Sequence, residues 1–115
     1  GPLLSTYYAT KSYVLSLTEA INYELKKKKS NVIVSALCPG PVDTNFNNVA
    51  NVTFKTKALS SKFVAKYAID EILENKKLII IPGRKMKLAK FFSRFLSDKA
   101  LLRITYKIQR KKLTK

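Results

Sequence analysis

The sequence is poor in the residues from which many catalytic sites are built. Its 115 residues include no histidine, one cysteine (Cys38) and three glycines. Without histidine, Ser-His and Cys-His nucleophile pairs are excluded within this chain, and the usual zinc ligand sets cannot be assembled. A single cysteine excludes an internal disulfide, which favours a reducing, cytoplasmic setting. Because Cys38 ends an apolar run, we expect a buried structural thiol rather than a nucleophile.

Glycine is also too scarce for a glycine-rich phosphate loop. Gly1, Gly40 and Gly83 lie far apart and cannot form a G-x-G-x-x-G or P-loop pattern. No apolar run approaches the roughly 20 residues that span a bilayer, and no secretory pattern opens the chain. The chain begins at Gly1 and its only methionine is Met86. We therefore expect a truncated product or a fragment rather than a complete translated protein.

Acidic residues are scarce, and the resulting positive charge is unevenly spread. Seven acidic residues face 23 basic ones, a net charge of +16. Residues 84–115 hold 12 basic residues and one acid, Asp98, for a net +11, whereas residues 1–83 carry +5. The charge pattern predicts two segments, an α/β segment at 1–83 and a basic amphipathic helical extension at 84–115.

Apolar periodicity predicts three helical regions and two strands. Residues 7–29 form an apolar stripe of helical spacing, and residues 32–37 are apolar and β-branched, as in a buried strand. A second helix is expected from Ser60 or Ser61 to about Asn75, because either serine can cap it. A strand at 78–81 follows, and then a helical tail with a break at Ser97-Asp98. The apolar stripe of the tail includes Leu88, Phe91, Phe92, Phe95 and Leu96.

The predicted order is α-β-α-β-α, which is typical of a layered α/β fold with a parallel sheet. Two strands are too few to make a complete sheet. Residues 45–59, which separate the first strand from the second helix, are polar with scattered apolar positions. We expect a loop there, in which a short helix is one alternative.

A tyrosine and a lysine four residues apart stand near the start of the chain. On a helix, Tyr7 and Lys11 face the same side. A free tyrosine has a pKa near 10, and a nearby ammonium favours the phenolate, so such a pair suits proton exchange with a substrate oxygen. The same spacing recurs at Tyr23 and Lys27, where a solvated helix end is expected. The spacing alone therefore does not identify a catalytic pair.

The order of the neighbouring motifs adds specificity. "YYATKSYVLSLTEAINYEL" is followed by "VIVSALCPGPVDT". This succession of a Tyr-x-x-x-Lys helix, a strand and a Pro-Gly turn resembles the short-chain dehydrogenase/reductase family. "LIIIPG" resembles the last strand of that family. The resemblance covers nearly the whole chain but only the C-terminal half of the family. It implies the C-terminal portion of a Rossmann-like doubly wound parallel sheet.

The resemblance implies an NAD(P)-dependent oxidoreductase that reduces a keto group, or oxidises an alcohol, on a small or apolar substrate. Tyr7 would be the general acid that protonates the carbonyl oxygen, and Lys11 would hydrogen-bond the nicotinamide ribose. The cofactor, NADP or NAD, would also lie against the turn after the first strand. The cofactor-binding residues implied are Tyr7, Lys11, Pro39, Gly40, Val42 and Thr44.

Other family features are missing from the sequence. The glycine-rich cofactor turn is absent, and Ser5 and Ser12 are too close to the tyrosine to be the family's catalytic serine. We therefore expect this chain to be inactive alone. The family also implies a homo-oligomer that pairs through the Tyr-Lys helix, and exposed sheet-facing surfaces where the rest of the fold is absent. The loop apolar residues match either a substrate lid or local packing; they are Phe46, Val49, Val52 and Phe54.

The basic tail supports a rival, non-catalytic function. Residues 84–115 could dock on an anionic membrane surface, with the apolar stripe inserted and the lysines near headgroups. Nucleic-acid binding through charge is a further alternative, which we consider unlikely. The simplest alternative is a C-terminal helix packed on the reductase core with a solvated basic face. The expected location is cytoplasmic, or peripheral to a membrane.

Overall fold

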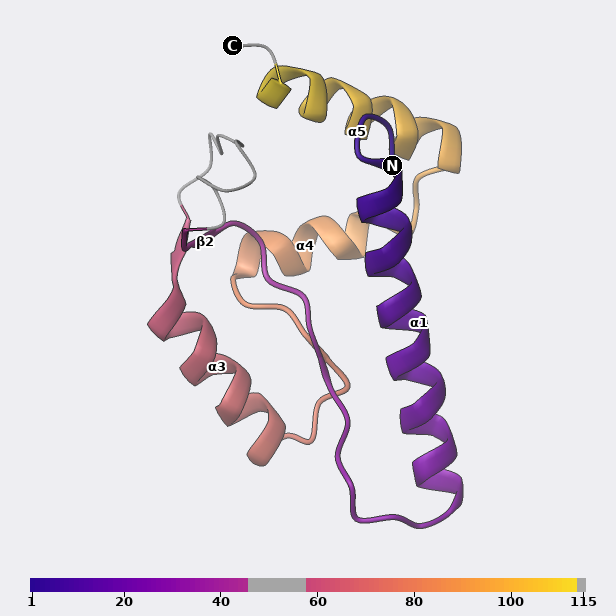
Figure 1. Cartoon of the computed structure of the whole chain (residues 1–115), viewed down its shortest axis with the longest axis vertical. Coiled ribbons are helices and arrows are strands. Elements are labelled where there is room, and N and C mark those ends of the chain that lie inside the picture. Colours follow the sequence, from indigo (N-terminus) through magenta and orange to yellow (C-terminus); the bar gives the residue numbers. More distant parts are fainter. Residues whose placement is uncertain (46–57, 114–115) are drawn as a thin grey trace.

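A computed structural model describes residues 1–45 and 58–113 of the chain. The described residues form four helices and four two-residue strands, arranged as a mixed α/β structure (Figure 1). The predicted order α-β-α-β-α is confirmed in its main elements. The helices are α1 (Ser5–Lys27), α3 (Ser61–Leu73), α4 (Arg84–Ser93) and α5 (Asp98–Leu113). The strands are β1 (Ala36–Leu37), β2 (Val42–Asp43), β3 (Leu59–Ser60) and β4 (Ile79–Ile80).

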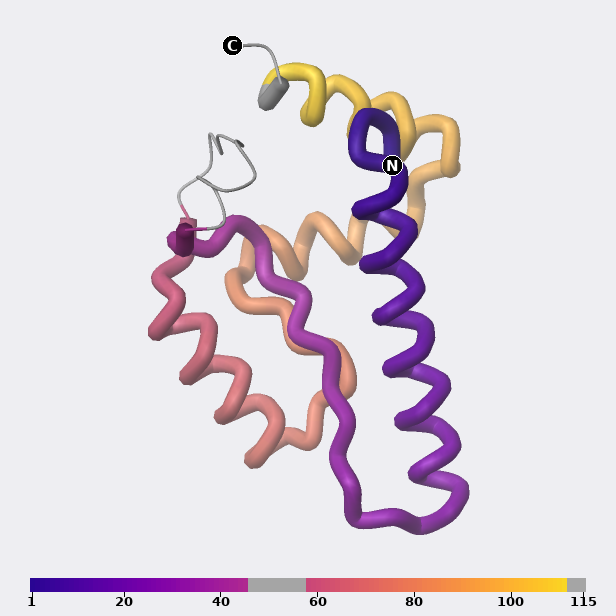
Figure 2. The backbone as a smooth tube through the Cα atoms, viewed as in Figure 1, coloured from indigo at the N-terminus to yellow at the C-terminus, as the bar shows by residue number. Residues whose placement is uncertain are grey.

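The strands pair in parallel, as the α/β pattern predicts. β1 pairs with β4, with Ala36 opposite Ile79, and the pairing is extended by a bond from the Cys38 N–H to the Ile80 carbonyl at 2.8 Å. β2 pairs with β3 in the same sense. Figure 2 shows the chain after α1 running back between α1 and α3, beside the segment that contains β4. A Rossmann-like fold is consistent with these two small sheets, although neither is a full doubly wound sheet.

The helix α3 begins and packs as its sequence dictates. The Ser60 hydroxyl accepts a hydrogen bond from the Phe63 N–H at 3.2 Å, which confirms the predicted N-cap. Val64 and Ala68, one turn apart, are buried, and so is Ile80 of β4. These three side chains and the neighbouring Pro82 form a small core.

The predicted buried strand at 32–37 is wrong in extent and in burial. Only Ala36–Leu37 is a strand, and Val32 is 61% exposed. β4 offers only two residues for pairing, so Val32 to Ser35 have no strand partner along most of their length. Cys38, expected to be buried, is a free thiol of intermediate exposure. An apolar run thus stays outside the core when too little neighbouring surface is available to cover it.

The helix α1 lies along one side of the molecule and is mostly open to solvent (Figure 1). Its apolar stripe, which includes Val14, Leu17 and Ile21, is exposed. Asn22 is the one described α1 residue that is buried. Its side-chain amide donates to the Val34 carbonyl at 3.2 Å and so ties the helix to the segment before β1.

A polar network joins α3 to both ends of the segment that carries β4. Glu71 accepts from the Tyr67 hydroxyl at 2.6 Å and pairs with the Lys77 ammonium at 2.8 Å. Lys87 of α4 donates to the same tyrosine oxygen at 2.7 Å. The bonds from Lys77 and from Tyr67 hold the pKa of the Glu71 carboxyl below its usual range.

Because the pKa of Glu71 is lower in the folded than in the unfolded chain, the unfolded chain binds more protons near that pKa. The contribution of Glu71 to stability is therefore complete above the ordinary carboxyl pKa of about 4.3 and falls as the pH drops through the lower folded value. We expect Glu71→Gln to lower the melting temperature at pH 7, and we expect this difference to shrink as the pH falls below the ordinary carboxyl pKa. Thermal unfolding followed by circular dichroism measures this. The control is Glu74→Gln, because Glu74 is an exposed acid that directly follows α3. An equal loss of melting temperature in both variants would contradict the prediction.

Candidate active site

Tyr7 and Lys11 lie on one side of the first turns of α1. The Lys11 ammonium nitrogen is 5.6 Å from the centre of the Tyr7 ring, over its face. This is a cation–π contact, which attracts the ammonium to the π electrons. Tyr7 is 45% exposed and Lys11 is exposed, so both polar groups are reachable from solvent. The helical spacing thus brings the predicted pair together.

The second pair has nearly the same local geometry. The Lys27 ammonium lies 5.3 Å from the centre of the Tyr23 ring. Both arrangements follow from a tyrosine and a lysine one helical turn apart. Local geometry therefore cannot separate a catalytic pair from a solvated one, and position in the fold has to decide.

Position does distinguish the two pairs. α1 and β1 run in opposite directions, so the first turns of α1 and the carboxyl end of β1 lie toward the same end of the molecule (Figure 2). Ligands of open α/β folds bind beyond the carboxyl ends of parallel strands. Tyr7 lies toward that end, whereas Tyr23 lies toward the opposite end of the helix, close to its last residue, Lys27.

The residue next to Tyr7 is fixed by a long-range contact. The Tyr8 hydroxyl accepts a hydrogen bond from the side-chain amide of Gln109, a buried residue of α5. The Tyr7 and Tyr8 rings meet edge to face, with centres 5.8 Å apart. Tyr8 and Gln109 thus support the start of α1. Sequence reasoning missed both, because the partners are separated by 101 residues and neither belongs to a local motif.

The predicted cofactor turn lies between β1 and β2. A Cβ added to Gly40 would stand 2.9 Å from Cγ of Met86, so the Met86 side chain of α4 would have to shift to make room for it. Val42 pairs with Leu59 across the small β2–β3 sheet. Thr44 follows β2 directly, and both Thr44 and Pro39 are exposed.

The two parts of the predicted site are not in contact. Figure 1 draws the first turns of α1 and the strand β2 on opposite sides of the molecule, with α4 between them in the view. The pair Tyr7–Lys11 is assembled by one helix, and the turn 39–44 by the two short sheets. A ligand that touches both would have to cross this separation.

The chemistry of these side chains fits a nicotinamide cofactor at the helix. A phenol and an ammonium, both open to solvent, are suited to a carbonyl oxygen and a ribose hydroxyl. The surface of Gly40 is covered by Met86, a flexible side chain that can change rotamer. The expected lid residues in 46–57 lie outside the described part of the chain. Within residues 1–45 and 58–113, no group of three or more His, Cys, Asp or Glu could hold a metal ion.

Comparison with known proteins supports the family resemblance over part of the chain. The family model of short chain dehydrogenases matches residues 1–54. This is the N-terminal part of the chain, so the match does not extend to nearly the whole chain, and the "LIIIPG" strand lies outside it. Nothing matches among the curated proteins or among the solved structures. All the predicted site residues fall within the match: Tyr7, Lys11, Pro39, Gly40, Val42 and Thr44.

The Tyr8–Gln109 contact predicts that α5 depends on Tyr8 rather than on Tyr7. Tyr8→Phe leaves the buried Gln109 amide without its acceptor, which costs about 1–3 kcal/mol. We expect faster amide hydrogen exchange in α5, measured by mass spectrometry, and a lower unfolding free energy. Tyr7→Phe leaves the acceptor in place and is the matched control. Equal exchange in the two variants would refute the anchoring role of Tyr8.

Proposed function

We propose that this chain supplies the catalytic tyrosine and lysine of an NAD(P)-dependent short-chain dehydrogenase. Its substrate would be a small or apolar ketone, or the corresponding alcohol. The observation that carries the proposal is the family match over residues 1–54, which contains both the Tyr-Lys helix and the turn 39–44. The exposure of Tyr7 and Lys11 at the ligand-binding end of the fold supports it.

In this proposal the Tyr7 hydroxyl moves the proton. It donates its proton to the carbonyl oxygen as a ketone is reduced, which leaves a phenolate, and in the reverse direction the phenolate accepts the proton of the alcohol. The nicotinamide, when bound, supplies or accepts the hydride. Lys11 has a flexible stem and three rotatable N–H donors, so its ammonium can leave the ring face and reach a ribose hydroxyl.

We expect the purified chain to show no ketone-dependent oxidation of NADH or NADPH above the rate without protein. The sequence contains no glycine-rich turn to hold the pyrophosphate and no serine at the family's spacing before Tyr7. Absorbance at the reduced nicotinamide band measures the rate over a panel of short and long-chain ketones. Clear turnover would show that the missing parts are unnecessary.

The role of Tyr7 can be tested in a chimera. Residues 1–54 replace the matching segment of a characterised short-chain dehydrogenase, which provides the remaining parts of the site. We expect Tyr7→Phe to lower kcat about 10²- to 10⁴-fold, the usual contribution of a general acid.

Tyr23→Phe in the same chimera is the matched control, because Tyr23 has the same lysine contact but lies toward the other end of α1. It should retain the kcat of the unsubstituted chimera. Cofactor binding and circular dichroism establish that each variant is folded. Equal activity of the chimera with and without the Tyr7 hydroxyl would refute the proposed role.

A further inference from the structure

The helix α4 and the turn after it expose an apolar surface. Phe95 is 74% exposed, and Phe91 contacts both Phe92 and Phe95 edge to face, with ring centres 5.7 and 5.4 Å apart. The members of this apolar ridge recur at spacings of three and four residues, the first three in α4 and the last two in the turn after it. They are Leu88, Phe91, Phe92, Phe95 and Leu96, all of them exposed.

The contacts of α4 leave this ridge uncovered. Met86 packs against Gly40, and Lys87 donates to the Tyr67 hydroxyl of α3 at 2.7 Å. These contacts hold the first turn of α4 against the rest of the fold. The aromatic side chains of the ridge come from the end of α4 and the turn after it, and they contact one another. The ridge is thus a fixed apolar feature on a helix already held in place.

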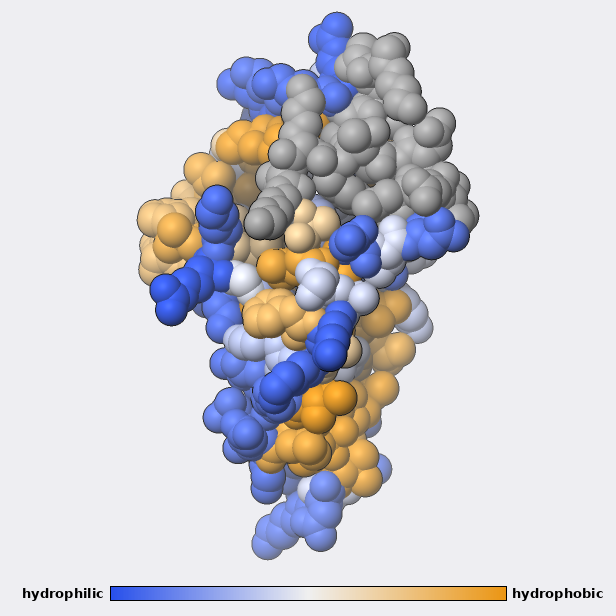
Figure 3. Space-filling model, turned by 90° about the vertical axis from the view of Figure 1, so that its left-hand side faces the viewer, coloured by the Kyte–Doolittle hydropathy of each residue, from blue (hydrophilic) through white to orange (hydrophobic). Residues whose placement is uncertain are grey.

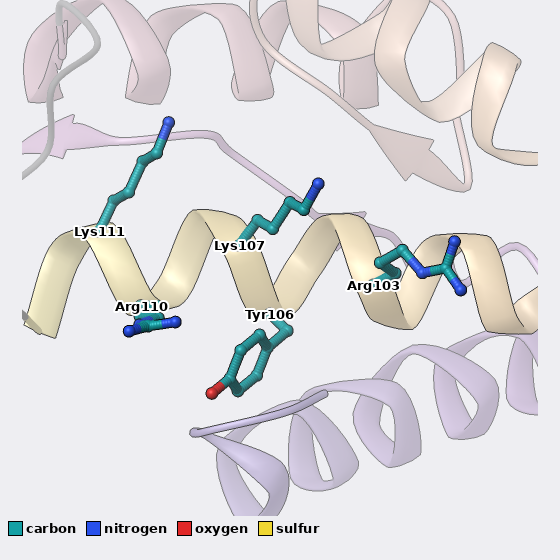
Figure 4. A pocket seen from close by; sticks show the side chains of 5 residues that line it. All are labelled: Arg103, Tyr106, Lys107, Arg110 and Lys111. Carbon is teal, nitrogen blue, oxygen red and sulfur yellow. The ribbon is translucent and has the colours of Figure 1, made fainter.

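Positive charge surrounds the ridge. Lys90 and Arg94 lie within the same turns and are exposed, and the sequence from 75 to 97 contains no acidic residue. In α5, Arg103, Lys107 and Lys111 project from one side of the helix (Figure 4). Figure 3 shows hydrophobic and hydrophilic residues side by side on the face that it draws.

The basic face of α5 also borders an open hollow. It has a volume of about 530 Å³ and is lined by Arg103, Tyr106, Lys107, Arg110 and Lys111. Four of these five residues are cationic, so the hollow suits an anionic group. Apolar residues of α5, Leu102 and Ile108 among them, are exposed as well. The two helices therefore share a basic and apolar character.

We propose that α4 and α5 dock on an anionic lipid bilayer and lie in the plane of its surface. The ridge of α4 enters the boundary between headgroups and acyl chains, and the flanking lysines and arginines contact the anionic headgroups. No described helix is long and apolar enough to cross a membrane. Peripheral binding needs no spanning segment, because a basic amphipathic helix gains both apolar burial and electrostatic attraction.

Charge complementarity favours this occupant over two others. A second copy of the chain would bring two segments of net charge +11 together, and like charges repel. Nucleic acid would neutralise the charge, but base stacking uses aromatic rings interspersed along a groove. Here the phenylalanine rings contact one another instead of standing apart, and two exposed leucines belong to the same ridge, which suits insertion into an apolar medium. The proposal is independent of the reductase function, since it uses no residue of the Tyr-Lys site.

Flotation of the purified full chain with vesicles tests the proposal. One set of vesicles is made of phosphatidylcholine alone. The other set is phosphatidylcholine that contains roughly 30% phosphatidylserine, an anionic lipid. Flotation is chosen because aggregated protein sinks while bound protein rises with the lipid. We expect the chain to float with the anionic vesicles and to be released by about 0.5 M salt, which screens charge. Absence of flotation, or equal flotation with neutral vesicles, would overturn the proposal.

Substitutions distinguish binding through the ridge from non-specific adsorption of other exposed apolar residues. Phe91→Ser with Phe95→Ser should weaken binding to anionic vesicles by about tenfold or more, because two inserted rings are lost. Val14→Ser with Leu17→Ser is the matched control, since Val14 of α1 and Phe91 are both 55% exposed. The control should float as the unmodified chain does, and an equal loss in both pairs would overturn the proposal.

Charge reversal and a competing polyanion complete the test. Lys90→Glu with Arg94→Glu should weaken binding to anionic vesicles about tenfold, because these charges then repel the headgroups. A labelled single-stranded oligonucleotide is added in a separate titration. If it binds more tightly than the anionic vesicles and loses affinity on the Phe91 and Phe95 substitutions, the ridge is a nucleic-acid surface and the membrane proposal fails. Circular dichroism verifies that the variants keep their helix content.

Discussion

The parallel pairing of β1 with β4 is the contact around which the described structure is organised. It involves only two residues on each strand, yet it carries Ile80, which is fully buried, while Val64 and Ala68 of α3 are also buried. A lone two-stranded pair is marginally stable in water, so the pairing depends on packing by other elements. The polar network of Glu71 then holds the segment that leads into β4 and the first turn of α4. Each of these contacts requires the others, because none buries much surface alone.

The same shortage of buried surface accounts for the apolar side chains that are exposed to solvent. The apolar stripe of α1 and the ridge of α4 both have helical spacing that is typical of core-facing helices, but the two small sheets offer too little area to cover them. Large uncovered apolar patches mark contact surfaces or aggregation sites. The two patches differ in their surroundings. The α4 ridge has basic neighbours on a segment without acids, whereas α1 carries Glu19 and Glu24 beside its stripe.

Within the candidate site, α1 places Tyr7 and Lys11 on the same side, and a residue distant in the sequence contacts the adjacent Tyr8. Gln109 of α5 bonds Tyr8, so the C-terminal segment supports the start of the helix that bears the pair. The turn 39–44 is built separately, where β1 ends and β2 begins, and Met86 packs on its glycine. The site is thus divided between a helix and a turn, and α4 stands between them in the view of Figure 1.

Local patterns in the sequence were sufficient to predict the helices, a cap at Ser60 or Ser61 and the proximity of Tyr7 to Lys11. Each depends on residues a few positions apart, whose geometry the backbone largely dictates. They could not predict that residues 32–35 lie outside the strand, that Met86 packs on Gly40 or that Gln109 bonds Tyr8. Pairing length, burial and contacts between remote segments depend on how much surface the neighbouring elements present. Only the tertiary structure decides that, because the free energy of burial belongs to the assembled surfaces and not to any one segment.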